Sequence, residues 1–132
     1  MGVERRALQI IVAIASLVPL TAGASGFLIG PAMVGIVAAP PGADSHFSYL
    51  SGLLLGIGLG FVTTIPHIEN RSRRVRLLAI IVVIGGLARL LALGLRGHPT
   101  GPTLFALAME LLVTPCLALW QSRVARRAGF DA

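Results

Sequence analysis

The sequence is poor in charge, in acidic residues and in sulfur. Only 12% of its 132 residues are charged, whereas about 25% is usual in soluble domains. There is no lysine, and the single cysteine, Cys116, excludes an internal disulfide, a Cys-x-x-Cys redox pair and a zinc–thiolate cluster. Hydrophobic residues make up 55% of the chain, which is more apolar surface than a globule of this length can bury. We therefore expect lipid to be the solvent for much of that surface.

Four long apolar runs predict an all-α, polytopic membrane protein. A membrane-spanning helix needs about 20 mostly apolar residues, and the runs are continuous rather than alternating, which argues against the strands of a barrel. We expect one membrane domain over residues 1–132, an up-and-down bundle of four transmembrane helices. The predicted spans are residues 7–28, 46–66, 77–95 and 102–120, separated by loops over 29–45 and 67–76. The alternative for the first run is a signal peptide cleaved after Ala22-Gly23-Ala24.

The arginines predict how the chain crosses the membrane. Nine of the eleven flank the predicted spans on one side, and the net charge is +6. Since positive charge stays in the cytoplasm, we expect both termini and the 67–76 loop to be cytoplasmic and the 29–45 loop to be external. Nucleic acid is not an expected partner, because the arginines border apolar runs instead of forming a soluble basic face. The nine are Arg5, Arg6, Arg71, Arg73, Arg74, Arg76, Arg123, Arg126 and Arg127.

Two charged residues lie inside the apolar runs. Arg89 precedes the turn between the last two spans by about as many residues as Glu110 follows it. Residues equally far from the turn of an antiparallel hairpin lie at the same depth, so we expect the two side chains to meet. A lone charge at the centre of a membrane helix costs about 2.5–3.5 kcal/mol on insertion scales, which favours pairing. The pair is either a structural ion pair that fixes the helix register or the floor of a ligand- or proton-handling site.

Other polar residues are expected to extend such a site towards the external surface. Arg96 follows Arg89 by seven residues on the same helical face, roughly 10 Å further along. We expect these residues to form an outward-facing funnel above the Arg89–Glu110 pair, with simple interfacial anchoring of the histidines as the alternative. Asp44 or Ser45 is also expected to cap the second helix. The candidate ligand-binding residues are Arg89, Glu110, His46, Asp44, Tyr49, Arg96 and His98.

Small residues predict close helix packing. Ser48, Gly52, Gly56 and Gly60 recur every fourth residue in the second span, which leaves a smooth groove for another helix. Gly85 and Gly86 of the third span are the expected opposing surface. The alternative is a homodimer face.

No residue pattern indicates a metal ion or a cofactor, and no catalytic residue is predicted. Asp44 and His46 are too few for a metal site, and the glycines around Gly58 lie inside a span and are not a nucleotide-binding loop. Residues 121–132 are expected to form a short, basic, solvated helix end.

The chain resembles a family of small bacterial membrane proteins, the domain of unknown function four-three-four-five, over nearly its whole length. The resemblance implies a four-helix, multi-pass protein of the bacterial cytoplasmic (inner) membrane and implies no reaction. A looser likeness to DoxX-type proteins concerns the fold alone. The residues that carry the resemblance are Ala7-Leu8-Gln9, Gly30-Pro31, His46-Phe47-x-Tyr49-Leu50-Ser51-Gly52, Gly85-Gly86-x-x-Arg89, Gly97-x-Pro99, Glu110-Leu111-x-x-Pro115 and Trp120-Gln121.

Three functional hypotheses follow. The favoured one is a non-enzymatic membrane protein that is an accessory subunit or binds a lipophilic or anionic ligand, with membrane lipids and a second copy of the chain as expected partners. The alternatives are a proton-coupled transporter of small molecules and a membrane enzyme acting on an isoprenoid- or sterol-like substrate. Both alternatives need Glu110 to take up a proton, which would break its ion pair with Arg89.

Overall fold

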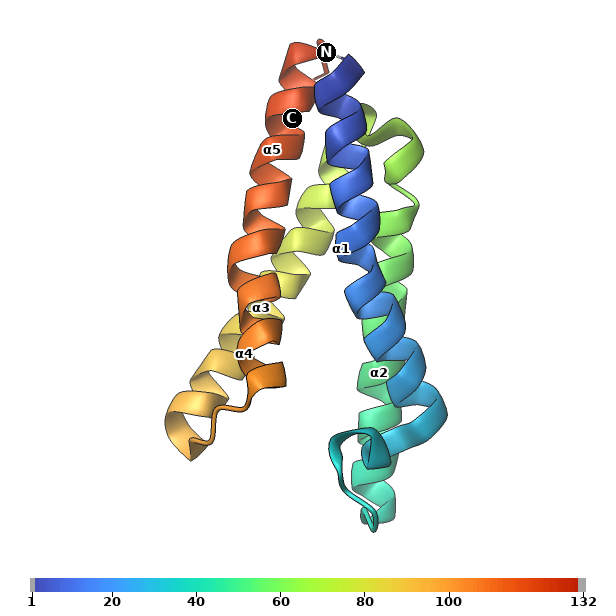
Figure 1. Cartoon of the computed structure of the whole chain (residues 1–132), viewed down its shortest axis with the longest axis vertical. Helices are drawn as coiled ribbons and strands as arrows, with labels where there is room; N and C mark the ends of the chain where they lie inside the picture. Colours follow the sequence, from blue (N-terminus) through green and yellow to red (C-terminus); the bar gives the residue numbers. More distant parts are fainter. Residues whose placement is uncertain (1, 131–132) are drawn as a thin grey trace. The chain divides into compact units, whose positions relative to one another are not determined.

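The computed structural model describes residues 2–130, and this part of the chain is helical without any strand (Figure 1). The predicted all-α class is therefore confirmed. The elements in chain order are α1 (Gly2–Ile29), the 3₁₀ helix η1 (Gly30–Val34), α2 (Pro41–Val62), the 3₁₀ helix η2 (Ile65–Asn70), α3 (Ser72–Arg96), α4 (Gly101–Ala108), the π-helix η3 (Met109–Val113) and α5 (Thr114–Arg127).

Four helical stretches are long and apolar enough to cross a membrane. They are Gly2–Val34, Pro41–Val62, Ser72–Arg96 and Gly101–Arg127, and each contains most of one predicted span. Only 6–22% of the most apolar 18-residue window in each stretch is buried inside the protein. Because so many apolar side chains face outward, the surrounding solvent must itself be apolar. The chain is thus a multi-pass membrane protein, while the cytoplasmic location of its termini stays a prediction.

Helix α2 begins earlier than the sequence indicated. Its N-cap is Pro40, whose side chain makes no capping hydrogen bond, and Asp44 lies in the first helical turn. The expectation that Asp44 or Ser45 caps this helix is therefore wrong. Pro41 explains the early start, because the fixed φ of proline suits the first helical position and its missing N–H is not needed there.

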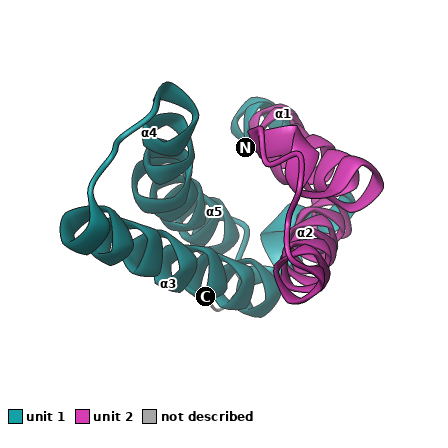
Figure 2. Cartoon of the chain, turned by 90° about the horizontal axis from the view of Figure 1, so that it is seen from below, with its two compact units in different colours: residues 1–9, 66–132 teal, residues 10–65 magenta. Residues whose placement is uncertain are grey.

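The helices group into two compact units (Figure 2). Unit 1 comprises Met1–Gln9 and Pro66–Ala132, and unit 2 comprises Ile10–Ile65. Each unit is described by itself.

In unit 2, α1 and α2 pack through small residues at close range. A Cβ atom added to Gly23 would lie 2.5 Å from the Leu55 backbone nitrogen, and one added to Gly58 would lie 3.0 Å from the Leu20 side chain. Gly26 faces the Ser51 side chain in the same way. The absence of side chains at these positions lets the two backbones approach, which provides the packing contact that lipid alone does not drive.

The stripe of small residues predicted in the second span lies on a different face of α2 from the residues that contact α1. A Cβ atom added to Gly52 or Gly56 would meet no atom within 4 Å, and Ser48 and Gly60 are only partly buried. The stripe is therefore not the face that meets α1, and its packing against the third span or a second copy stays a prediction.

In unit 1, the best-buried side chains lie near the chain ends and the η2–α3 corner. Leu8 and Ile68 are fully buried, as is Ala125 of α5. Gln121 is also buried, and its Nε2 donates to the Ile68 carbonyl oxygen at 2.7 Å and to the Ser72 Oγ at 3.0 Å. The expectation of a solvated helix end over residues 121–132 is therefore wrong for this part of α5; Asp131 and Ala132 lie outside the described residues.

The α1–α2 contact predicts opposite effects for two glycine-to-alanine substitutions on candidate spans. Gly23→Ala forces a methyl group onto the Leu55 backbone and should lower the thermal stability of the detergent-solubilised protein. The matched control, Gly52→Ala, meets open space and should keep or raise stability, because alanine favours helix by up to about 1 kcal/mol. Melting followed by circular dichroism measures both, and greater destabilisation by Gly52→Ala would contradict the described packing.

Candidate functional site

The candidate site lies on the helical hairpin formed by α3 and the α4–η3–α5 stretch. Residues 97–100 connect the two arms, and the Thr100 side chain caps α4 by accepting from the Thr103 backbone N–H. The cap satisfies one of the free backbone N–H groups at the start of α4. Arg89 and Glu110 lie at about equal distances from this turn, on arms that run in opposite directions (Figure 1).

The Arg89 and Glu110 side chains form a two-point ion pair. Nε of Arg89 donates to Oε2 of Glu110 at 3.0 Å, and Nη2 donates to Oε1 at 2.9 Å. The contact predicted from equal spacing about the turn is thereby confirmed. The planar guanidinium matches the carboxylate at two points, so this geometry also fixes the orientation of both side chains.

A glycine on α3 allows the two arms to approach at this level. Gly86 is buried, and a Cβ atom added there would lie 2.8 Å from Cβ of Glu110 and from a methyl group of Leu111. Its neighbour Gly85 would meet nothing within 4 Å. Gly86 therefore provides the close contact beside the ion pair, and Gly85 does not.

Glu110 lies in a π-helical turn, a feature that the sequence analysis missed. Pro115 has no N–H to donate to the carbonyl oxygen four residues earlier, and its ring would clash with that group in a regular helix. The chain widens into η3 just before it, and both the backbone N–H and the Oγ1 of Thr114 bond to the Met109 carbonyl oxygen, the latter at 2.7 Å. Single π-turns inside α-helices occur frequently at functional sites. The signal in the sequence is Thr114-Pro115 within an apolar run.

The two partners of the ion pair differ in exposure. The side chain of Arg89 is 44% exposed and that of Glu110 is 18% exposed. The pair uses Nε–H and one Nη2–H of Arg89, whereas a guanidinium carries five N–H donors. Three donors therefore remain on the more exposed partner, and two of them lie side by side along the edge formed by Nη1 and Nη2.

The other predicted site residues fall into two groups. Arg96 and His98 are exposed and belong to unit 1, at the turn end of the same hairpin. Asp44, His46 and Tyr49 are exposed on the first turns of α2 and belong to unit 2. Since these three belong to a different unit from the ion pair, a common site stays a prediction. Within residues 2–130, no three His, Cys, Asp or Glu side chains gather as metal ligands.

Unit 1 has a second set of polar contacts, at the opposite end from the hairpin turn, that the sequence analysis missed. Nε of Arg5 lies 3.0 Å from Oε2 of Glu69, and Arg127 pairs with Glu4. Trp120 donates from Nε1 to Glu4 at 3.4 Å. The signal was the placement of Glu4 and Glu69 among basic residues. These contacts join the first turns of α1 to η2 and to α5.

The comparisons with known proteins identify a family but no activity. Residues 7–121 match the profile of a family described as Domain of unknown function (DUF4345). No curated protein and no solved structure matches the chain. The matched segment includes Arg89, Glu110 and the whole hairpin between them.

The ion pair predicts a stability difference between two matched substitutions. The side chains of Arg5 and Glu69 have almost the same exposures as those of Arg89 and Glu110, 42% and 15% against 44% and 18%, but they lie at helix ends. Glu110→Gln leaves Arg89 uncompensated among apolar residues and should lower the unfolding free energy by about 2 kcal/mol. Glu69→Gln should lower it by less than about 1 kcal/mol, because Arg5 lies at a helix end, is partly exposed to water and keeps its hydrogen bond to the Pro66 carbonyl oxygen.

Denaturation of the two variants in detergent micelles measures this difference. The charge-swapped variant Arg89→Glu/Glu110→Arg should recover part of the loss caused by Glu110→Gln. Equal stability of the Glu110→Gln and Glu69→Gln variants, with no recovery in the swap, would contradict the importance assigned to the pair.

Proposed function

We propose that this chain, which belongs to the DUF4345 family, is a non-enzymatic membrane protein that binds a lipophilic anion at Arg89. The observation that carries this proposal is the side-on geometry of the Arg89–Glu110 pair. Both hydrogen bonds come from the Nε–Nη2 side of the guanidinium, and its Nη1–Nη2 edge keeps two parallel N–H donors.

The free edge of Arg89 suits a carboxylate or a phosphate. Such anions accept two parallel hydrogen bonds from a guanidinium, and charge-assisted bonds of this kind are about twice as strong as neutral ones. Glu110 fixes the guanidinium before the ligand arrives. Since the arginine side chain is already ordered, less conformational entropy is lost on binding.

The surroundings of the pair favour a ligand with an apolar tail. Leu87 and Leu90 on α3 and Leu112 in η3 are 47–65% exposed. A hydrocarbon chain can cover these side chains while the anionic group meets Arg89. Arg96 and His98, further along the hairpin, add polar groups towards its turn and extend the proposed path of the anionic end.

The same geometry disfavours the two proton-transfer alternatives. A transporter or an acid–base enzyme would require Glu110 to accept a proton, and the protonated carboxyl group would lose its ion pair with Arg89. Glu110 is accordingly assigned a positioning role, holding Arg89, and no catalytic residue is proposed.

The proposal predicts selective binding of laurate, which has a carboxylate, over dodecanol, which has the same tail without charge. Titration calorimetry of the purified protein in dodecylmaltoside micelles measures both affinities. Laurate should bind the wild-type protein more tightly than dodecanol does. Arg89→Gln should weaken laurate binding by about tenfold or more, as expected for a lost hydrogen bond between charged groups, and should leave dodecanol binding unchanged.

A second arginine of α3 provides the control. Arg76 is exposed, lies in the first turns of the helix, and carries the same charge as Arg89. Arg76→Gln should bind laurate as the wild-type protein does. Equal affinities for laurate and dodecanol, or the same loss of laurate binding in both variants, would refute the proposed site.

A further inference from the structure

The connection between α1 and α2, residues 30–40, is apolar and exposed. Residues 7–43 contain no charged side chain, so the connection has none. Its large apolar side chains are 43–93% exposed; they are Met33, Val34, Ile36 and Val37. Loops that face water are usually polar, and clustered apolar side chains on a surface mark a place where something apolar is bound.

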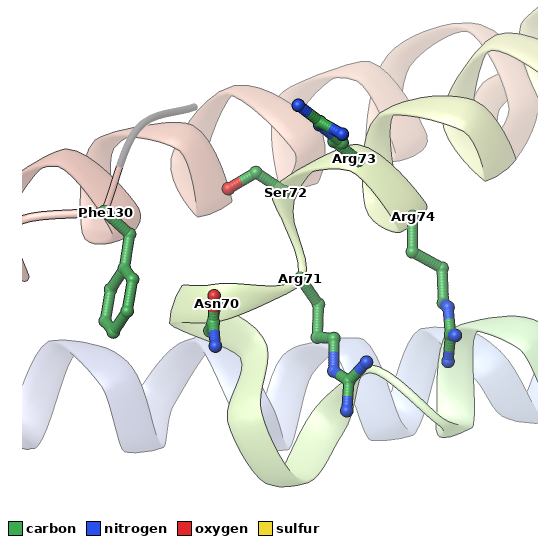
Figure 3. A pocket seen from close by; sticks show the side chains of 6 residues that line it. All are labelled: Asn70, Arg71, Ser72, Arg73, Arg74 and Phe130. Atoms are coloured by element: carbon green, nitrogen blue, oxygen red, sulfur yellow. The ribbon is translucent and has the colours of Figure 1, made fainter.

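The connection between α2 and α3 has the opposite composition. Residues 70–74 and Phe130 line a cavity of about 340 Å³ at the start of α3, and three of them are arginines (Figure 3). Arginines next to a membrane span suit water and lipid headgroups. The lack of charge in residues 30–40 is therefore particular to that connection and is not shared by the loops of this chain in general.

The backbone of the α1–α2 connection has a defined conformation. The Gly35 N–H bonds to the Ala32 carbonyl oxygen, the Ile36 N–H bonds to the Pro31 carbonyl oxygen, and Gly35 has a φ of +84°. This pattern is a Schellman motif, and it ends η1. Pro31 is buried and η1 contacts α2. The connection is thus fixed to unit 2 on one side and presents its apolar side chains on the other.

The length of α1 places the connection at a membrane boundary. Helix α1 is free of charge from Ala7 to its end at Ile29, and at 1.5 Å per residue this part extends about 33 Å. The hydrocarbon core of a bilayer is about 30 Å thick. The helix has therefore crossed the core where η1 begins.

The first turns of α2 indicate the same level. A Cβ atom added to Gly30 would lie 3.2 Å from Oδ1 of Asp44, so this carboxylate lies beside the end of α1. His46 and Tyr49, within the next two turns, are exposed. Charged and amphipathic aromatic side chains favour the headgroup region. The polar start of α2 and the apolar connection beside it therefore lie at the edge of the hydrocarbon core.

We propose that the α1–α2 connection inserts its apolar side chains among the lipid acyl chains just beneath the headgroups. The last residues of α1, Phe27, Leu28 and Ile29, are 58–78% exposed and belong to a membrane span, so they already face lipid. The apolar surface of the connection continues theirs directly along the chain. Interfacial segments of this kind bury their apolar face about 5–10 Å into the boundary between headgroups and acyl chains.

This surface anchors unit 2 at one membrane boundary without any charge. It belongs to unit 2, whereas Arg89 and Glu110 belong to unit 1. The proposal therefore does not depend on ligand binding at Arg89.

The test measures how deep a fluorescent label lies in a bilayer. In the full-length protein with Cys116→Ser, Val37→Cys carries the label, and Ile36→Cys is a second position with the same expected result. The matched control is Gly42→Cys, which is also exposed, meets open space, and lies in the first turn of α2 ahead of Asp44. Each labelled protein is placed in phosphatidylcholine nanodiscs and quenched by lipids with doxyl groups at different depths and by aqueous iodide.

The labels at positions 36 and 37 should lie about 5–10 Å inside the boundary and should be quenched by doxyl lipids and not by iodide. The label at position 42 should be quenched by iodide. Quenching of all three labels by iodide alone would mean that water covers the connection and would overturn the proposal. Protection of the labels at positions 36 and 37 from both quenchers would overturn it too, because another part of the chain or a second copy would then cover this surface.

Discussion

The pairing of Arg89 with Glu110 is the constraint on which the organisation of the α3–α5 hairpin depends. Each residue alone places a charge inside the apolar part of a candidate span, and two hydrogen bonds of 2.9–3.0 Å join them. The hydrocarbon core offers little force to drive apolar helices together, whereas an unpaired charge there is costly. The pair therefore specifies which residues of the two arms lie side by side, and Gly86 provides the space for that approach.

The two ends of unit 1 have different chemistry. At the hairpin turn, Arg96 and His98 are exposed and make no ion pair among the described residues. At the opposite end, Glu4 and Glu69 each pair with an arginine, and buried Gln121 joins α5 to the η2–α3 corner. The arginines of these two ion pairs are partly exposed, so that water can also solvate their charges. The central pair is the one set of charges that has to be satisfied within the apolar stretch.

Much of the architecture could be predicted from the sequence, but local backbone geometry could not. Apolar runs long enough to span a membrane predicted the four helices, and equal spacing about the turn predicted the Arg89–Glu110 contact. The π-turn at Met109–Val113 was not predicted, because a proline such as Pro115 inside a helix can be accommodated either by a kink or by a π-turn. The burial of Gln121 escaped because its partners, Ile68 and Ser72, are distant in the sequence. The basic composition of residues 121–132 alone had indicated a solvated helix end.

The depth of two spin labels beside the ion pair tests the central claim most directly. Leu87 and Leu112 are exposed, and each lies two residues from the pair in the same direction along the antiparallel arms. With Cys116 replaced by serine, nitroxides placed singly at these positions in lipid bilayers are compared by power saturation with oxygen and a water-soluble nickel complex. The account predicts equal depths within about 3 Å, both inaccessible to nickel. Depths that differ by more than one helical turn, about 5.4 Å, or ready access of nickel to either label, would contradict it.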